Sequence, residues 1–253
     1  LLNAKKELQH QNEILEVKVK ERTQELELTQ GVIIEAMASL AETRDQETGD
    51  HVMRTRYYVQ LLAVTLAGHP KFVSYLSNID PDELGTAATL HDIGKVGVPD
   101  HILLKPGRLT PEEFEEIKKH TTYGHATLSK LVKRLPGNAF LKFADVIAWT
   151  HHEKWDGHGY PRGLVGDEIP ISGRLMAIAD VYDAMVSPRV YKPPMGHSEV
   201  VDFIMSQSGS HFDPDVASAF RELADTFQYI ASELTVEEMN GELIANLVGS
   251  IAK

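Results

Sequence analysis

The sequence lacks cysteine altogether, and this absence excludes disulfide bonds and metal sites built on thiolates. Any metal ion must therefore be bound by histidine and carboxylate side chains. Basic residues are also few: 25 Lys and Arg stand against 37 Asp and Glu, for a formal net charge of −12 at pH 7. General nucleic-acid binding depends on a basic surface that releases counterions, so this charge argues against that function. One small phosphorylated substrate is not excluded, because bound divalent cations reverse the potential locally.

Long apolar runs are absent too. No segment approaches the roughly 18 apolar residues of a membrane span, and none shows a signal-peptide pattern. We therefore expect a cytoplasmic protein without a membrane span. The composition, 42% hydrophobic and 25% charged, is typical of a globular protein. A length of 253 residues indicates one domain with an appendage.

Residues 1–34 form the expected appendage, because they contain no proline and a single glycine, Gly31. Apolar residues recur every seven positions in two registers: Leu1, Leu8 and Leu15, then Val19, Leu26 and Ile33. This pattern is typical of a two-stranded parallel coiled coil, in which Asn12 would fix the register at some cost in stability. A single amphipathic helix lying on the domain is the alternative, but the narrow apolar stripe favours a homodimer.

Residues 35–227 show helical periodicity and no alternating strand pattern of useful length, so we expect an all-α domain. Met37, Leu40 and Ala41 should begin its buried face. Thr110 should cap a helix and close a capping box with Glu113. Other helices are expected from Asp82 to Lys95 and over residues 139–152, 171–186, 199–205 and 214–227, with a loop over 96–108. Residues 228–253 should be a helical or partly ordered tail.

Histidine and carboxylate side chains gather in a few short segments. The clearest is His151–Pro161, where two adjacent histidines precede a loop that Gly157 and Gly159 allow to bend. Glu47 and His51 are four residues apart, so on a helix both side chains can reach one point. These segments predict a site where a metal acts beside a bound substrate.

Two of the segments consist of adjacent ligand types, His91-Asp92 and His151-His152. Side chains of adjacent residues diverge by about 100° on a helix, so such pairs suit a cluster of ions better than a single ion. A carboxylate such as Asp92 can bridge two ions roughly 3.5–4 Å apart, a standard arrangement for phosphodiester hydrolysis. The candidate ligands are Glu47, His51, His91, Asp92, His120, His151, His152 and Asp180.

An isolated helical histidine is more often a surface or hydrogen-bonded core residue than a ligand. We therefore assign no site role to the histidines outside these segments: His10, His69, His101, His125, His197 and His211. Within the glycine-loop segment, Glu153, Lys154 and His158 also receive no role.

Five blocks between Leu40 and Pro214 resemble the HD-GYP family of cyclic dinucleotide phosphodiesterases. They are Glu47–Arg54, His91–Lys95, Lys119-His120, His151–Pro161, and Ala179–Ala184 with Arg189–Lys192; Gly209–Pro214 resembles a closing motif. The resemblance implies an all-α HD-domain helical bundle around two or three divalent ions. It matches the candidate ligands to family ligands, with Glu47 completing the site where a third ion binds. Mixed imidazole and carboxylate ligation suits Fe or Mn, with Ni, Mg or other divalent ions as substitutes.

The expected reaction is in-line attack on phosphorus by a metal-bridging hydroxide, with Asp92 bridging the ions. Lys95 should contact a nonbridging phosphate oxygen and stabilise its developing charge. The resemblance implies that Tyr160, Arg189 and Lys192 bind the guanine and the second phosphate. Two further residues, Arg54 and Asp183, should orient ligands.

Within the family the substrate would be cyclic di-GMP, opened to linear pGpG or cut further to GMP. The alternatives are a phosphodiesterase that prefers pGpG or a mixed cyclic dinucleotide, and a nonenzymatic receptor or docking module for a diguanylate cyclase. A complete ligand set argues against the nonenzymatic reading. A mononucleotide nucleotidase would leave the Asp156–Pro161 loop unexplained. The coiled coil suggests a signalling helix in a two-component system, with a receiver or sensor domain before Leu1.

Overall fold

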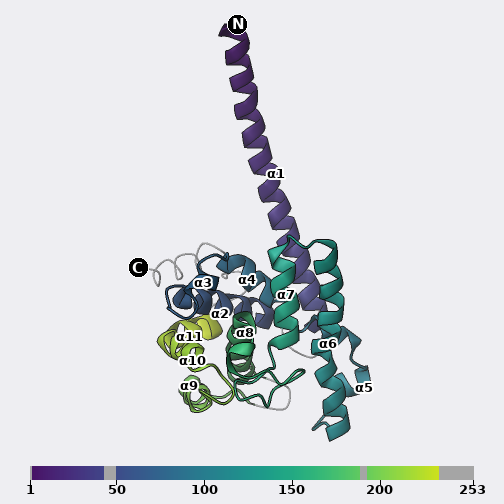
Figure 1. Ribbon diagram of the computed structural model, residues 1–253. Helices are drawn as coiled ribbons and strands as arrows, with labels where there is room; N and C mark the ends of the chain where they lie inside the picture. The colour runs from purple at the N-terminus through teal and green to yellow at the C-terminus, as the bar shows by residue number, and fades with distance from the viewer. Residues whose placement is uncertain (1, 43–49, 189–192, 234–253) are drawn as a thin grey trace.

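The computed structural model describes residues 2–42, 50–188 and 193–233, which form helices joined by loops (Figure 1). Within these ranges the only β-type pairing consists of two isolated bridges, Asp156 with Val165 and Ser208 with Phe212. The predicted all-α fold is confirmed. No helix in the described part of the chain has the length and apolar character that crossing a membrane requires.

The first helix, α1 (Leu2–Glu42), spans 41 residues and projects from the body of the molecule (Figure 1). Its last turns reach the body, where Ala38 and Ala41 are buried. Met37 and Leu40 are 53% and 68% exposed, so the prediction of a buried face was wrong for these two residues and confirmed for Ala41. The packed face consists of the small alanines, because they allow α1 to approach its neighbours closely.

The body is a bundle centred on α2 (Asp50–Leu66). The other elements are α3 (Val73–Leu76), α4 (Pro81–Ala88), η1 (Ile93–Gly97), α5 (Asp100–Leu103), α6 (Pro111–Arg134), α7 (Ala139–Thr150), η2 (Gly166–Glu168), α8 (Ile171–Val186), α9 (His197–Ser206), α10 (Pro214–Glu222) and α11 (Ala224–Glu233). Helix α2 contacts α4, α8, α10 and α11. Tyr58 of α2 stacks on Phe227 and meets Tyr182 edge-on, which joins α2 to α11 and α8.

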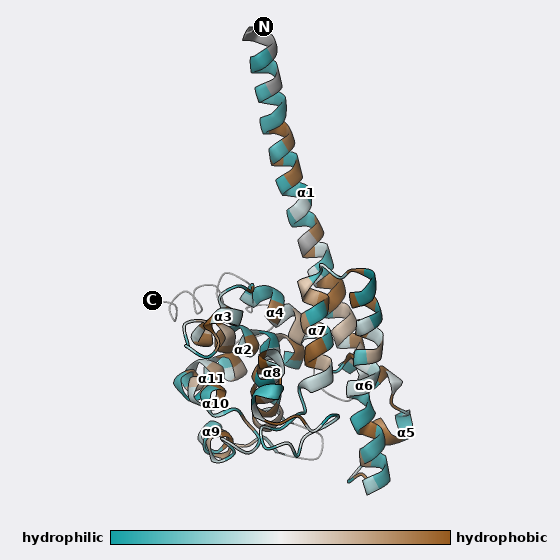
Figure 2. Cartoon of the chain, in the orientation of Figure 1, coloured by the Kyte–Doolittle hydropathy of each residue, from teal (hydrophilic) through white to brown (hydrophobic). Residues whose placement is uncertain are grey.

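Figure 2 shows hydrophobic and hydrophilic residues interspersed along the free length of α1.

Local sequence signals set several helix ends as predicted. Thr110 and Glu113 form the expected capping box at the start of α6, and α8 begins at Ile171 and ends at Val186. The helix predicted over residues 214–227 is instead two helices, since α10 ends before Leu223 and α11 continues to Glu233.

The helix predicted from Asp82 to Lys95 was also wrong. Helix α4 ends at Ala88, His91 and Asp92 lie in a turn, and η1 is a 3-10 segment. The cause is a close approach to α6: a Cβ on Gly94 would lie 1.9 Å from the carbonyl oxygen of His120. The chain turns out of α4 to make this contact. The loop predicted over residues 96–108 likewise contains the short helix α5.

Candidate metal centre

Four histidines share one ring arrangement, in which Nδ1 lies against an oxygen acceptor of the protein. The Nδ1 distances are 2.8 Å from His51 to Asp183 Oδ2, 3.0 Å from His91 to Ala88 O, 2.7 Å from His120 to Ile117 O and 2.9 Å from His151 to Ile147 O. Because an ionised carboxylate or a carbonyl oxygen can only accept, Nδ1 carries the proton in each ring and donates it. In the neutral rings Nε2 is left with a lone pair, the arrangement of metal-binding histidines.

The first group of converging ligand atoms belongs to Asp92, His120, His151 and His152, whose atoms lie within 4.8 Å of one another. The Asp92 Oδ1 atom lies 3.1 Å from His120 Nε2 and 3.6 Å from His151 Nε2. The two Nε2 atoms are 3.4 Å apart. Lone pairs at these distances repel one another unless a cation or a proton lies among them.

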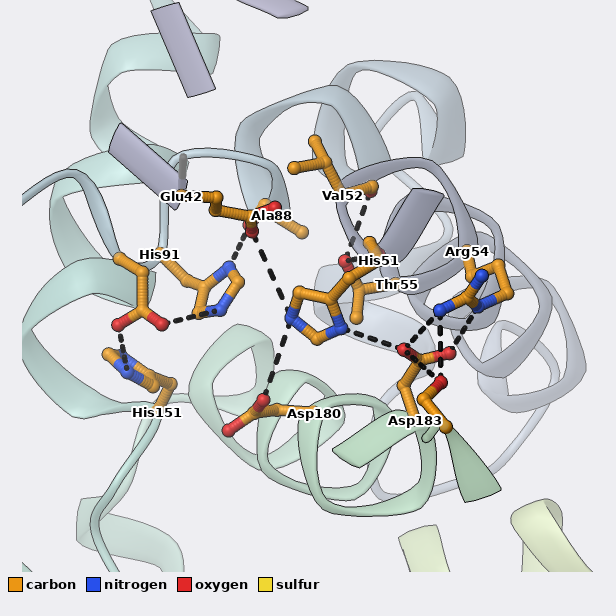
Figure 3. A network of polar contacts seen from close by, with 12 residues as sticks. Glu42, His51, Val52, Arg54, Thr55, Ala88, His91, His151, Asp180 and Asp183 are labelled. Carbon is orange, nitrogen blue, oxygen red and sulfur yellow. Dashed lines mark hydrogen bonds and ion pairs between the residues drawn. The ribbon is translucent and has the colours of Figure 1, made fainter. Parts of the chain in front are cut away.

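The second group consists of Glu42, His51 and His91, again with ligand atoms within 4.8 Å of one another. Asp180 lies beside it, with Oδ1 3.8 Å from His51 Nε2. Figure 3 shows His51 between Asp180 and Asp183, with Glu42 and His91 on its other side.

Asp92 connects the two groups. Its Oδ1 faces the first group, while its Oδ2 lies 3.2 Å from His91 Nε2. A carboxylate placed in this way can bridge two ions. The centre therefore has the layout of at least two adjacent cation sites that share one aspartate.

Two buried atoms of the centre test whether a metal fits. Asp92 Oδ1 and His91 Nε2 have no hydrogen-bond partner of good geometry among the described residues. Buried polar atoms without such partners are costly, and a coordinated cation would satisfy both. Imidazole and carboxylate donors together suit a divalent ion. The buried cluster is therefore compatible with a divalent metal site.

The protonation states favour metal binding. Burial alone would raise the pKa of Asp92, but Lys95, His91 and His120 outweigh it and hold that pKa well below its usual value. Burial lowers the pKa of His151, and burial together with His151 and His120 lowers the pKa of His152 further. Asp92 is thus held as an anionic carboxylate and His151 and His152 as neutral imidazoles, the forms that bind metal. Burial would lower the pKa of His91, but the neighbouring Asp92 outweighs it and raises that pKa.

Lys95 lies on η1 with its Nζ 2.8 Å from Asp92 Oδ2. The close contact between Gly94 and α6 brings this lysine to the centre, rather than the α-helical turn that the sequence suggested. Its ammonium is buried beside the bridging carboxylate. It is therefore placed to meet an anionic group that approaches the ions.

Arg54 and Asp183 lie behind His51. Arg54 donates from Nε and Nη2 to the two carboxylate oxygens of Asp183, over 2.6 and 2.8 Å. Burial would raise the pKa of Asp183, yet Arg54 and His51 hold it far below its usual range. The ionised carboxylate fixes the ring of His51, so the structure brings these residues together as predicted.

The glycine loop after α7 brings Tyr160 beside the first group, with ring centroids 4.8 Å from His152 and 6.4 Å from His120. Burial raises the pKa of the Tyr160 hydroxyl, which therefore stays protonated. Sequence reasoning missed two neighbours on α6: Lys118 Nζ lies 5.4 Å from the Tyr160 ring and 5.0 Å from the Phe114 ring. An aromatic residue and a lysine at i and i+4 before His120 were the available signal.

Sequence reasoning also missed Glu153. Its carboxylate is buried and accepts hydrogen bonds from the backbone N–H groups of Arg162 and Leu164, over 2.8 and 2.9 Å. The loop folds back tightly here, since a Cβ on Gly159 would lie 2.2 Å from Lys154 N. Glu153 therefore holds the two sides of the loop together. An acidic residue just before a glycine-rich turn was the only sequence signal.

Three predicted site residues, Glu47, Arg189 and Lys192, lie outside the described residues. The histidines left without a role have ordinary surroundings where contacts are seen. His125 stacks on Trp149 at 3.7 Å and pairs with Asp145, and Tyr182 shares a hydrogen bond with His197.

This fold and centre agree with the comparison to known families. The family model described as HD domain matches residues 35–216, and the chain belongs to this family. The predicted resemblance to the HD-GYP phosphodiesterases is also confirmed.

Three curated relatives illustrate the similarity. A "Probable cyclic di-GMP phosphodiesterase" of Vibrio cholerae is 51% identical over 91% of this chain and 53% of its own length. A "Cyclic di-GMP phosphodiesterase" of Thermotoga maritima is 44% identical over 78% of this chain and 51% of its own. A "3'3'-cGAMP-specific phosphodiesterase 2" of Vibrio cholerae is 41% identical over 83% of this chain and 38% of its own. The chain thus spans about half the length of these relatives, or less.

Proposed function

We propose that this chain is a metal-dependent phosphodiesterase domain that hydrolyses cyclic di-GMP to linear pGpG, or on to GMP. The observation that carries the proposal is the convergence of two ligand groups on the carboxylate of Asp92. A shared carboxylate between two cation sites suits in-line displacement at phosphorus. The relatives named as cyclic di-GMP phosphodiesterases supply the substrate class.

Divalent ions, when bound here, lower the pKa of water and polarise the phosphate. The proposed ligands are Glu47, His51, His91, Asp92, His120, His151, His152 and Asp180, for two or three ions of Fe or Mn. Lys95 contacts a nonbridging phosphate oxygen and stabilises the charge that develops on it. Asp183 and Arg54 keep His51 in its metal-binding tautomer.

The substrate wall is proposed to include Tyr160, which offers a ring face to a guanine beside the first ligand group. Arg189 and Lys192 are assigned to the guanine and the second phosphate, because guanidinium and ammonium groups suit these partners. The Tyr160 ring lies next to the rings of His152 and His120, which supports its place in this wall.

A mixed cyclic dinucleotide is the second candidate substrate, because one relative at 41% identity is named as specific for 3'3'-cGAMP. The two candidates differ in one base, so discrimination depends on the wall rather than on the metal centre. Parallel kinetics with both dinucleotides would separate them, as the ratio of their kcat/KM values reports specificity directly.

The helix α1 is proposed to form a parallel coiled coil with a second copy of the chain. Its exposed stripe includes Val19, Leu26, Ile33 and Leu40, at 64%, 61%, 54% and 68% exposure. The seven-residue spacing of this stripe therefore continues beyond residue 34 to the domain itself. An upstream receiver or sensor domain and a diguanylate cyclase partner complete the proposal. The relatives' greater length leaves room for such a domain.

The testing experiment is hydrolysis of cyclic di-GMP by protein purified with Fe or Mn under low oxygen. We expect turnover by the wild type and a loss of at least about 100-fold in His151→Ala, since a ligand would be missing. His125→Ala is the matched control, because His125 lies outside both ligand groups. Binding of cyclic di-GMP without turnover under any metal would refute the enzyme and favour a receptor.

A further inference from the structure

Glu42 is the last residue of α1, and it ends inside the metal centre. Its side chain is 2% exposed and belongs to the ligand group of His51 and His91. Figure 3 shows it reaching toward this group from the direction opposite Asp180. Glu47, the glutamate that the sequence motif indicates, lies outside the described residues. Because Glu42 belongs to α1, the helix itself supplies a carboxylate to the centre.

Two carboxylate groups lie close to the Nε2 atom of His51. Its Nδ1 proton is committed to Asp183, so in the neutral ring Nε2 presents a lone pair. Glu42 Oε1 lies 4.0 Å and Asp180 Oδ1 3.8 Å from that same nitrogen. Two carboxylate oxygens thus lie within 4.0 Å of this nitrogen, and both His51 and Glu42 are buried. A divalent ion placed there would convert their repulsion into attraction.

His91 points to the same conclusion independently. Its ring is fully buried, and its Nε2 has no hydrogen-bond partner of good geometry among the described residues. The Nδ1–H group donates to Ala88 O, so the ring is held with Nε2 toward Glu42 and Asp92. A buried imidazole fixed in this way has its Nε2 atom oriented to coordinate a metal ion.

We propose that Glu42 is a direct ligand of the divalent ion held by His51 and His91, so that α1 forms part of the metal centre. This inference rests on the proposed metal-dependent function and adds a residue to it. Movement of α1 would therefore be transmitted to the site, also because α1 packs on η1, which carries Lys95. A shift of the helix along its axis would withdraw the ligand, at about 1.5 Å per residue of displacement.

The test is metal binding rather than activity. Glu42→Gln keeps the shape of the side chain and removes its charge, while Glu21→Gln makes the same change on the exposed part of α1. We expect calorimetric titration with Mn to show the ion at the His51 group bound at least about tenfold more weakly in Glu42→Gln. The other ion, and both ions in Glu21→Gln, should bind as in the wild type.

Thermal unfolding distinguishes a ligand from a structural residue. Unfolding temperatures in chelator give the metal-free reference for each protein. Added Mn should raise the unfolding temperature of Glu42→Gln less than that of the wild type. Equal Mn affinity in all three proteins, or an equal rise of their unfolding temperatures with Mn, would overturn the inference alone. A wild type that binds no metal would overturn the proposed function as well.

Discussion

Glu153 shows how a single buried carboxylate can determine the shape of the glycine loop. It accepts two backbone hydrogen bonds from Arg162 and Leu164, across the turn that carries Tyr160. Bonds to a charged acceptor are each worth about 1.5–3 kcal/mol, so the loop depends strongly on this side chain. The same carboxylate makes no part of either ligand group.

We predict that Glu153→Gln raises KM for the dinucleotide about tenfold or more while the metal content stays unchanged. The amide can accept one of the two hydrogen bonds but places an N–H group against the other donor. Steady-state kinetics with metal analysis would measure both quantities. Glu168→Gln is the control, because Glu168 accepts a single exposed hydrogen bond in the same loop. Equal KM values for the two variants would contradict the role of Glu153.

His211 gives the molecule a pH-dependent contribution to stability. Burial, aided by Lys154, lowers its pKa to about 4, while in the unfolded chain its pKa should be about 6.5. Between these values the unfolded state binds the proton and the folded state does not. The free energy of unfolding should therefore fall as pH falls from about 6.5 toward 4.

Between pH 7 and pH 5, His211 is predicted to lower the free energy of unfolding by about 1–2 kcal/mol. Urea unfolding of the wild type and His211→Gln in chelator at both pH values would measure it. The wild type should lose more stability than the variant over this interval. Parallel losses in the two proteins would show that His211 does not titrate between its folded and unfolded values.

Among the elements, η1 depends on a contact that no local signal reveals. Capping residues predicted the start of α6, because Thr110 and Glu113 act within their own turn. The end of α4 could not be predicted in this way, since it follows from the packing of Gly94 on the backbone of α6. The exposure of Met37 and Leu40 was also not predicted. The apolar stripe along α1 continues past residue 34, so these two residues are exposed instead of buried.

The residues of the site also fall into those that local motifs predict and those that depend on tertiary packing. Most of the side chains that converge in the structure are ones that the sequence predicted as ligands, because each sits in a short motif with its own spacing. Glu42 and Glu153 escaped, since their positions depend on where α1 ends and on how the glycine loop folds back. Both are buried acidic residues, and burial is a tertiary property.

Replacing Gly94 by alanine should separate η1 from α6. The added Cβ would lie 1.9 Å from His120 O, so the two elements must move apart. Overpacking of this kind costs about 1–3 kcal/mol, and here it would also displace Lys95 and His120. We expect lower stability in urea and weaker Mn binding. Gly137→Ala, with nothing within 4 Å of its new Cβ, should leave both unchanged; a Gly94→Ala protein that matches this control would disprove the contact's importance.

At the scale of the whole molecule, the exposed apolar stripe of the long helix α1 is not covered by the rest of the described chain. Its apolar stripe, with Leu26 at 61% and Ile33 at 54% exposure, would stay in water in a monomer. We predict a dimer at micromolar concentration in sedimentation experiments. Leu26→Lys should dissociate it, because the substitution buries a charge in the seam.

Gln24→Lys is the control for this variant, since its heptad position faces away from the seam. It adds the same charge to the same exposed helix and should leave the dimer intact. Deletion of residues 1–30 should yield a monomer. A wild type that sediments as a monomer, with no change on this deletion, would exclude the coiled coil.

The central claim is that two ligand groups sharing Asp92 hold divalent ions. Anomalous scattering from crystals of protein loaded with Mn or Fe measures this directly, because it locates each ion relative to its ligands. We predict one peak among Asp92, His120, His151 and His152, and a second among Glu42, His51, His91 and Asp92. No peak at coordination distance from either oxygen of Asp92 would contradict the account.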